Sequence, residues 1–134
     1  MLSERRILID TSLWVAFFRP GCPPPLLKRV RDCLSEERVV GIAPVWLELL
    51  RGAGDESFYT TLRDFLRGVP LLPLDEAFWE GAYRLGFTLR REGLTVPSMD
   101  IVIAAAAIRF QVPLWHQDRH FDLISRYSEL IIHH

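Results

Sequence analysis

The sequence predicts an α/β fold in which helices cover both faces of a central, mostly parallel sheet. Short apolar segments alternate with longer segments of helical spacing along the 134 residues. The short segments are apolar almost throughout, which is typical of parallel strands buried on both faces. Ile101–Ile108 is apolar on every side, so we expect this helix at the centre of the protein. With 49% hydrophobic residues, the chain is expected to form one globular domain over residues 1–134.

The first half of the chain is expected to contain two strands, each followed by helices. Arg6–Ile9 is predicted as a short buried strand. Thr11 and Ser12 offer hydroxyl caps for the next helix, which runs through Phe18. Three further helices or strands are marked by apolar spacing, proline and glycine: a helix with Leu26, Leu27, Val30 and Leu34, a strand over Arg38–Ile42, and a helix from Pro44 to Gly52. A helix with Phe58, Leu62, Phe65 and Leu66 follows.

The second half is expected to continue the alternation. Val69–Leu74 is apolar and predicted as a short strand, after which Asp75 caps a long helix. Ser98 is predicted to cap the central apolar helix, whose first turn holds Asp100. The chain is then expected to form a strand over Val112–Trp115, a short helix or turn over His120–Arg126, and a closing strand over Glu129–Ile132.

Four carboxylates occupy related places in this predicted fold. Asp10 and Asp118 follow apolar strands, Glu48 lies in the helix after the second strand, and Asp100 opens the central helix. Open parallel sheets bind ligands beyond the C-terminal ends of their strands, so we expect all four at one edge of the sheet.

Acids gathered in a partly dry pocket repel one another, which raises their pKa values and destabilises the fold unless a cation neutralises them. Ligation by acids alone fits Mg²⁺ or Mn²⁺ better than Zn²⁺. One or two such ions activate water and stabilise an in-line displacement at phosphorus. The predicted chemistry is therefore hydrolysis of a phosphodiester.

Structural roles compete with this interpretation at each acid. Asp10, Asp100 and Asp118, taken singly, are equally well explained as helix caps or partners of a helix dipole. Glu48 lies among apolar residues, and an ion pair with Arg51 is its structural alternative. The chemical interpretation therefore depends on the four acids meeting in space.

Two other residues are secondary candidates. The Ser12 hydroxyl either caps a helix or fixes a metal-bound carboxylate or a phosphate. Asp122 is a fifth acid, which we expect to cap its local turn and to lie outside the direct ligands. His116 and His120 flank Asp118; proton transfer or metal binding is one interpretation of them, but histidines beside a site are more often supporting or exposed residues, and we assign them no catalytic role.

Composition narrows the setting of the protein. The formal net charge of −1 gives no overall attraction to nucleic acid, and Lys28 is the only lysine. Cys22 and Cys33 lack metal-ligand spacing and are expected to be reduced. Ile101–Ile108, the longest apolar run, is too short to span a membrane, and the first ten residues lack the pattern of a signal peptide. We expect a cytoplasmic protein with no membrane partner.

Four segments, ILIDTSLW, PVWLELLRGA, PSMDIVIAAAA and HQDRHFDLI, together resemble the signatures of PIN-domain ribonucleases, and specifically of VapC-type toxins of prokaryotic toxin–antitoxin pairs. The resemblance extends from Ile7 to the last expected strand. It implies a three-layer α/β/α sandwich and a Mg²⁺- or Mn²⁺-dependent endoribonuclease that cleaves RNA. The implied active site consists of Asp10, Glu48, Asp100 and Asp118, with Ser12 beside the first acid.

The resemblance also implies partners and a division of roles. A homodimer is implied, as is a small cognate antitoxin whose C-terminal segment covers the site, in a complex that represses its own promoter. Our hypothesis is that Asp10, Asp100 and Asp118 hold the ion, directly or through water, while Glu48 orients or deprotonates the attacking water. The chain departs from the family at His120, where many relatives have a further acid two residues after the fourth.

Two other classes of function were weighed. A PIN-like domain without catalysis that binds a protein or nucleic-acid partner is the main alternative, and retention of all four acids argues against it. A phosphotransfer receiver or phosphatase fits poorly, because Lys28 is in an unsuitable place for a receiver and the chain has no DxDxT motif.

Overall fold

The computed structural model describes residues 5–134 and contains a three-stranded parallel sheet. Strand β1 (Ile7–Ile9) lies between β2 (Val39–Val40) and β3 (Leu114–Trp115). Ile7 pairs with Val39, and Leu8 pairs with Leu114. All residues of the three strands are buried, as expected for parallel strands covered on both faces. Two expectations extend to residues 1–4: the single domain over residues 1–134 and the absence of a signal-peptide pattern. For these four residues, both lie outside the described part of the chain.

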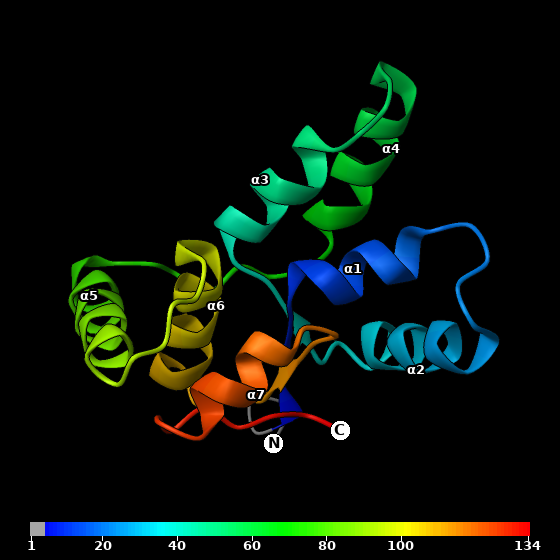
Figure 1. Ribbon diagram of the computed structural model, residues 1–134. Coiled ribbons are helices and arrows are strands. Elements are labelled where there is room, and N and C mark those ends of the chain that lie inside the picture. Colours follow the sequence, from blue (N-terminus) through cyan, green and yellow to red (C-terminus); the bar gives the residue numbers. More distant parts are fainter. Residues whose placement is uncertain (1–4) are drawn as a thin grey trace.

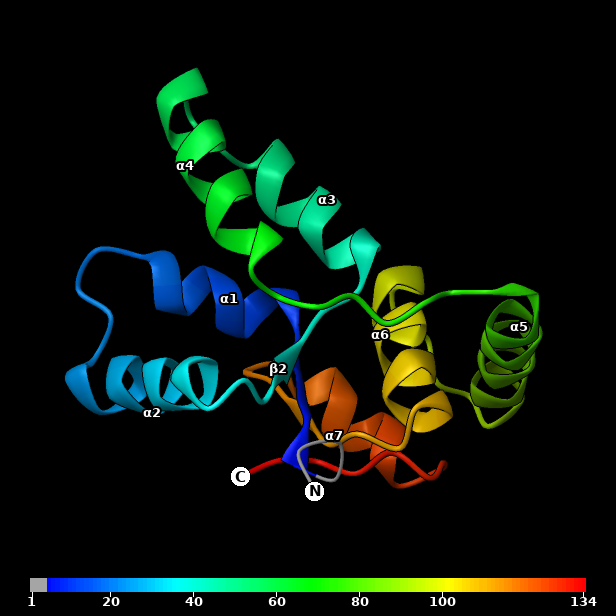
Figure 2. The same cartoon turned by 180° about the vertical axis from the view of Figure 1, so that it is seen from behind.

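Seven helices surround this sheet in the described part of the chain. They are α1 (Thr11–Phe18), α2 (Pro24–Ser35), α3 (Ala43–Arg51), α4 (Glu56–Arg67), α5 (Glu76–Arg91), α6 (Ser98–Arg109) and α7 (Arg119–Ser125). Figure 1 shows α1 and α2 on one side of the strands and α5 and α6 on the other, while α3 and α4 project as a hairpin. The reverse view in Figure 2 shows the same arrangement around β2. The predicted α/β class with helices on both faces is confirmed.

The predicted strand over Val69–Leu74 is wrong. Only Leu71 forms a bridge there, parallel to Gly41. The ladder does not extend because Pro70 has no N–H to donate on one side of this bridge, and on the other side the partner segment enters α3 at Ala43. This segment instead crosses as an extended connection between α4 and α5.

The predicted closing strand over Glu129–Ile132 is also wrong, since only Ile132 bridges β3, at Leu114. The Leu114 backbone makes both bonds, donating to the Ile131 carbonyl and accepting from the His133 amide.

Two helix caps differ from those predicted. The side chain of Asp10, rather than of Thr11 or Ser12, caps α1 by accepting from the Leu13 amide. At α6, Ser98 is the first helical residue, and Pro97 precedes it without a side-chain cap. In both cases the helix begins one residue earlier than predicted. The predicted cap of α5 by Asp75 is confirmed, through a bond from the Phe78 amide.

The core lies on both faces of the sheet. Helix α6 buries Ile103 through Ala107, as its uniformly apolar sequence predicts. On the other face, Trp14 is fully buried and contacts the rings of Phe18, Trp46 and Phe65. Both cysteines are free thiols. Within residues 5–134, no helix combines the length and the apolar character that a membrane crossing requires.

Candidate functional site

Three of the four predicted acids stand at the start of a helix, and the fourth, Glu48, lies within one. Asp10 joins β1 to α1 and caps that helix, and Asp118 caps α7 shortly after β3. Asp100 lies in the first turn of α6. Glu48 lies in the second half of α3, which follows β2. The C-terminal ends of β1, β2 and β3 therefore lead to Asp10, to the helix of Glu48 and to Asp118, while Asp100 comes from a helix that no strand directly precedes.

Asp10 is the one buried charged side chain among the described residues, with 2% of its surface exposed. One carboxylate oxygen accepts from the Leu13 amide at 2.9 Å, and the Ser12 hydroxyl donates to the carboxylate at 2.7 Å. Burial raises the pKa of Asp10, and the hydrogen bonds from Leu13 and Ser12 oppose this rise. The carboxylate is therefore fixed in position but carries an electrostatic cost when ionised.

Two consecutive hydroxyls connect Asp10 to the elements that carry the other acids. Thr11 donates to the Glu48 carboxylate at 2.6 Å, which joins α1 to α3. The Ser12 oxygen accepts from the Gln117 amide at 3.1 Å, in the residue before Asp118. Thr11 and Ser12 thus fix the positions of the acids relative to one another, whereas the sequence predicted that they cap a helix.

Asp100 and Asp118 meet at the ring of His120. The His120 Nδ1 lies 3.0 Å from Asp100 Oδ2 and 3.2 Å from Asp118 Oδ1. Burial raises the pKa of Asp100, and the negative charges of Asp118 and Glu48 add to this rise, while His120 opposes it. The mutual repulsion of acids expected from the sequence is therefore present at Asp100.

The structure gathers Asp100, Asp118 and His120 so that one possible ligand atom from each lies within 4.8 Å of the others. Asp10 is outside this group and is connected to it through Ser12 and the Gln117 amide. Glu48 acts on Asp100 through its charge. Sequence reasoning missed the contacts of His120; the signal was its position two residues after Asp118, at the start of the same helix.

His116 and Asp122 support the segment that carries Asp118. The His116 Nδ1 accepts from the Asp118 amide at 3.0 Å. Its Nε2 is buried, lies 3.4 Å from Asp122 Oδ1 and has no hydrogen-bond partner among the described residues. Asp122 is exposed on α7, and its contact is with His116 rather than with the other acids.

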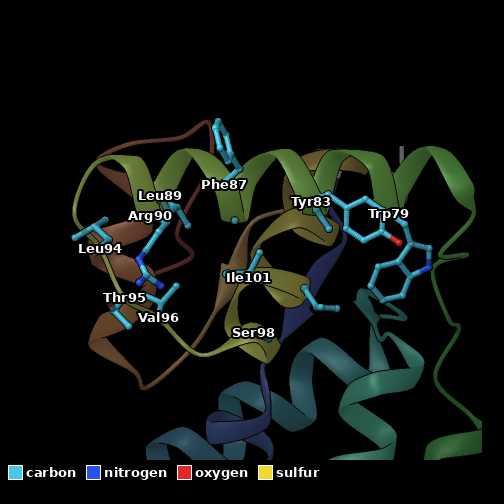
Figure 3. A pocket seen from close by; sticks show the side chains of 13 residues that line it. Trp79, Tyr83, Phe87, Leu89, Arg90, Leu94, Thr95, Val96, Ser98 and Ile101 are labelled. Carbon is cyan, nitrogen blue, oxygen red and sulfur yellow. The ribbon is translucent and has the colours of Figure 1, made fainter.

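The donor set fits a divalent cation. The carboxylates of Asp100 and Asp118 lie close together, and the pKa of Asp100 is raised, in part by the charge of Glu48. A bound cation would stabilise the ionised form of these acids. A cavity of about 560 Å³ lies elsewhere, between α5 and α6. Figure 3 shows it lined by Trp79, Tyr83 and Ile101, and none of the four acids contributes to it. The four acids therefore lie outside this cavity.

Comparison with known proteins agrees with this geometry. The family model described as PIN domain matches residues 7–127. The VapC ribonuclease Mb1587 of Mycobacterium bovis is 41% identical over 92% of this chain and 95% of its own length. The chain belongs to the PIN domain family of VapC ribonucleases. Ribonuclease VapC1 of Methanocaldococcus jannaschii is 26% identical to this PIN domain over 93% of the chain and 85% of its own length.

Solved structures share the fold of this PIN domain. VapBC2 from Rickettsia felis, bound to a DNA fragment from their promoter, gives a TM-score of 0.78 at 17% identity, covering 95% of this chain and 96% of the other. FitAcB from Neisseria gonorrhoeae gives the same TM-score and identity over 96% of each chain. At these identities the likeness concerns the fold alone, and it supports the three-layer α/β/α architecture.

Proposed function

We propose that this protein is a metal-dependent endoribonuclease and the toxin of a VapBC-type toxin–antitoxin pair. The observation that carries the proposal is the meeting of Asp100 and Asp118 at the sheet edge, with the pKa of Asp100 raised by burial and by its acidic neighbours. The 41% identity to proteins named VapC ribonucleases supports RNA as the substrate.

Asp10, Asp100 and Asp118 would hold Mg²⁺ or Mn²⁺, directly or through water. When bound, the ion lowers the pKa of water and neutralises charge that develops on the phosphate. Ser12 fixes the Asp10 carboxylate, and His116 fixes the loop that presents Asp118. These contacts pre-organise the acids before the ion arrives, so little reorganisation accompanies binding.

Glu48 takes the role of general base. The hydrogen bond from Thr11 restrains its carboxylate beside α1, and its charge acts on Asp100. In the proposed step Glu48 accepts a proton as the water oxygen forms a bond to phosphorus, and the bond from phosphorus to the leaving ribose oxygen breaks. The leaving oxygen then takes up a proton from solvent.

A catalytically inactive binding module is the competing function. It requires no defined arrangement of acids, and its four carboxylates would carry a repulsion that serves no purpose. The network that positions them through Thr11, Ser12 and His120, together with the named ribonuclease relatives, supports the enzyme.

A cognate antitoxin is the proposed protein partner. A cavity of about 310 Å³ between α1, α3 and α4 is lined mainly by apolar residues, together with Arg19 and Glu48. Val15 and Phe58 on its lining are 41% and 43% exposed. An antitoxin segment with apolar side chains and one cation would fill this cavity and reach the acids from it. The structural neighbours described as VapBC assemblies support a partner of this kind.

A homodimer through α5 is the proposed assembly. Tyr83 and Phe87, one turn apart, are 63% and 56% exposed. Glu80 precedes them on the helix, and Arg91 follows. Two copies of α5 packed antiparallel would place the rings together and bring each Glu80 near the other copy's Arg91.

We further propose a cytoplasmic location and a single PIN-like domain. The two free thiols of Cys22 and Cys33 suit a reducing compartment. An RNA substrate is also found there. The match of the family model over residues 7–127 supports one domain across most of the chain.

Cleavage of a mixed structured RNA tests the function. The purified protein is incubated with Mg²⁺, with Mn²⁺ and with EDTA, beside the variant Asp100→Asn as a control for contaminating nucleases. We expect cleavage only with metal and a loss of at least ~100-fold in the variant. Equal cleavage by the variant, or cleavage in EDTA, would overturn the assignment.

A further inference from the structure

His120 places an imidazole nitrogen between the carboxylates of Asp100 and Asp118. We propose that His120 is a direct ligand of the bound ion through Nδ1, and that this nitrogen makes the site favour Mn²⁺ over Mg²⁺. The inference rests on the metal-dependent function proposed above.

The distances around His120 match those between neighbouring ligands of one ion. Its Nδ1 is 3.0 Å from Asp100 Oδ2 and 3.2 Å from Asp118 Oδ1. Two adjacent donors, each about 2.1 Å from an octahedral ion, lie about 3.0 Å apart. The distances from this nitrogen to the two carboxylate oxygens are therefore close to the separation of adjacent ligands in an octahedral site.

The backbone holds His120 in this place. Its amide donates to Asp118 Oδ1 at 2.9 Å, so the residue lies in the capped first turn of α7. The imidazole is therefore anchored by the acid with which it would share the ion. Ligands on a helix end are held more firmly than ligands on a loop.

Exposure suits an ion that must also bind substrate. The side chain of Asp100 is 14% exposed, while those of His120 and Asp118 are 36% and 32% exposed. Open coordination positions at this rim would remain available to water and to a phosphate oxygen. A fully buried cluster would lack this access.

The nitrogen donor sets the metal preference. Mg²⁺ is a hard ion that takes oxygen ligands almost exclusively. Mn²⁺ also takes carboxylate and water, but it binds more tightly than Mg²⁺ when a nitrogen ligand is present. When Nε2 carries the ring proton, the Nδ1 of His120 presents a lone pair for coordination.

The competing role for His120 is a counter-ion. A protonated ring between Asp100 and Asp118 would neutralise them and occupy the place of the metal. The two roles give opposite results when the ring is removed. A ligand strengthens Mn²⁺ binding, so His120→Ala weakens it; a counter-ion competes with Mn²⁺, so the same change strengthens binding.

Pulsed EPR of bound Mn²⁺ tests direct coordination without reference to activity. The protein is prepared with 15N-labelled histidine, as wild type, as His120→Asp and as His134→Gln, a matched change at an exposed histidine. We expect a 15N hyperfine coupling in wild type and His134→Gln, and none in His120→Asp. Absence of the coupling in wild type, or its survival in His120→Asp, would overturn the proposal.

Metal titration supplies the second readout. We expect the ratio of the Mg²⁺ Kd to the Mn²⁺ Kd to fall roughly tenfold in His120→Asp, which exchanges the nitrogen ligand for an oxygen ligand. An unchanged ratio, or tighter Mn²⁺ binding by His120→Ala, contradicts the proposal. The variant Asp118→Asn separates the two levels of inference: if it leaves Mn²⁺ binding intact, the acids are not the metal site and the proposed function fails as well. Metal binding that needs Asp118 but shows no nitrogen coupling rejects only the role of His120.

Discussion

At the scale of single residues, Asp100 combines burial with neighbouring negative charge. Both raise its pKa above the ordinary value of 3.8, and Asp10 is shifted in the same direction by burial. Between the ordinary and the raised pKa the folded protein binds more protons than the unfolded chain, so stability falls as pH rises through this window. In the metal-free protein, ionisation of these acids therefore opposes folding.

Asp100→Asn is expected to reduce this pH dependence. In EDTA the variant should melt about 2–4 °C above wild type at neutral pH, with a smaller gain at pH values below 3.8. Thermal unfolding at several pH values measures the effect, and Asp64→Asn, which alters an exposed ion pair with Arg67, serves as the control. A pH profile identical to wild type would contradict the strain assigned to Asp100.

Ser12 is expected to support catalysis by holding Asp10 in place. Its hydroxyl donates to Asp10 and accepts from the Gln117 amide. Ser12→Ala removes both contacts, so we expect activity to fall roughly 10–100-fold and stability to fall by about 1–3 kcal/mol. Cleavage rate and urea unfolding are the measurements, with Ser12→Thr expected to recover part of the activity. Ser125→Ala, which removes a bond within α7, should leave the rate unchanged.

The acids themselves could be predicted from the sequence, but their network could not. Asp10 and Asp118 follow apolar segments, and this order along the chain indicates the end of a parallel strand. The contact of Thr11 with Glu48 spans 37 positions and depends on how α3 packs on α1. The contacts of His120 depend on the start of α7, which a search for apolar periodicity does not fix.

At the scale of elements, helices were easier to predict than strands. A helix such as α5 satisfies its backbone internally, and its sequence pattern extends over 16 residues. A strand forms its backbone hydrogen bonds with a partner strand, so its length depends on residues that are distant in the sequence. β2 and β3 have two residues each, so the segments beyond them form only the bridges at Leu71 and Ile132.

At Gly41 the backbone beside the sheet lies against the Trp46 side chain of α3. A Cβ there would overlap the indole of Trp46, while a Cβ at Gly81, inside α5, would meet nothing. Gly41→Ala should therefore lower stability by at least about 1–3 kcal/mol, and Gly81→Ala should raise it by about 0.5–1 kcal/mol. Urea unfolding of the pair measures both effects. Equal stability of the two variants would show that Trp46 can move aside.

At the scale of the whole molecule, the sheet holds four acids from distant parts of the chain at one edge. The hydrogen bonds of Asp10 with Ser12, of Glu48 with Thr11, and of Asp100 with His120 each join two elements or fix one end of a helix. The fold thus gathers charges that repel one another, and in the proposed function a divalent cation would remove the repulsion. Stability and activity are coupled through the same side chains.

The chemistry of the cleaved RNA ends tests this account most directly. The reaction is run with Mn²⁺ in water enriched in 18O, and the products are analysed by mass spectrometry. Attack by a water activated at the acids predicts 5′-phosphate ends that contain one solvent 18O, together with 3′-hydroxyl ends. Ends with a 2′,3′-cyclic phosphate and a 5′-hydroxyl would contradict it, because they show attack by the neighbouring ribose hydroxyl rather than by water.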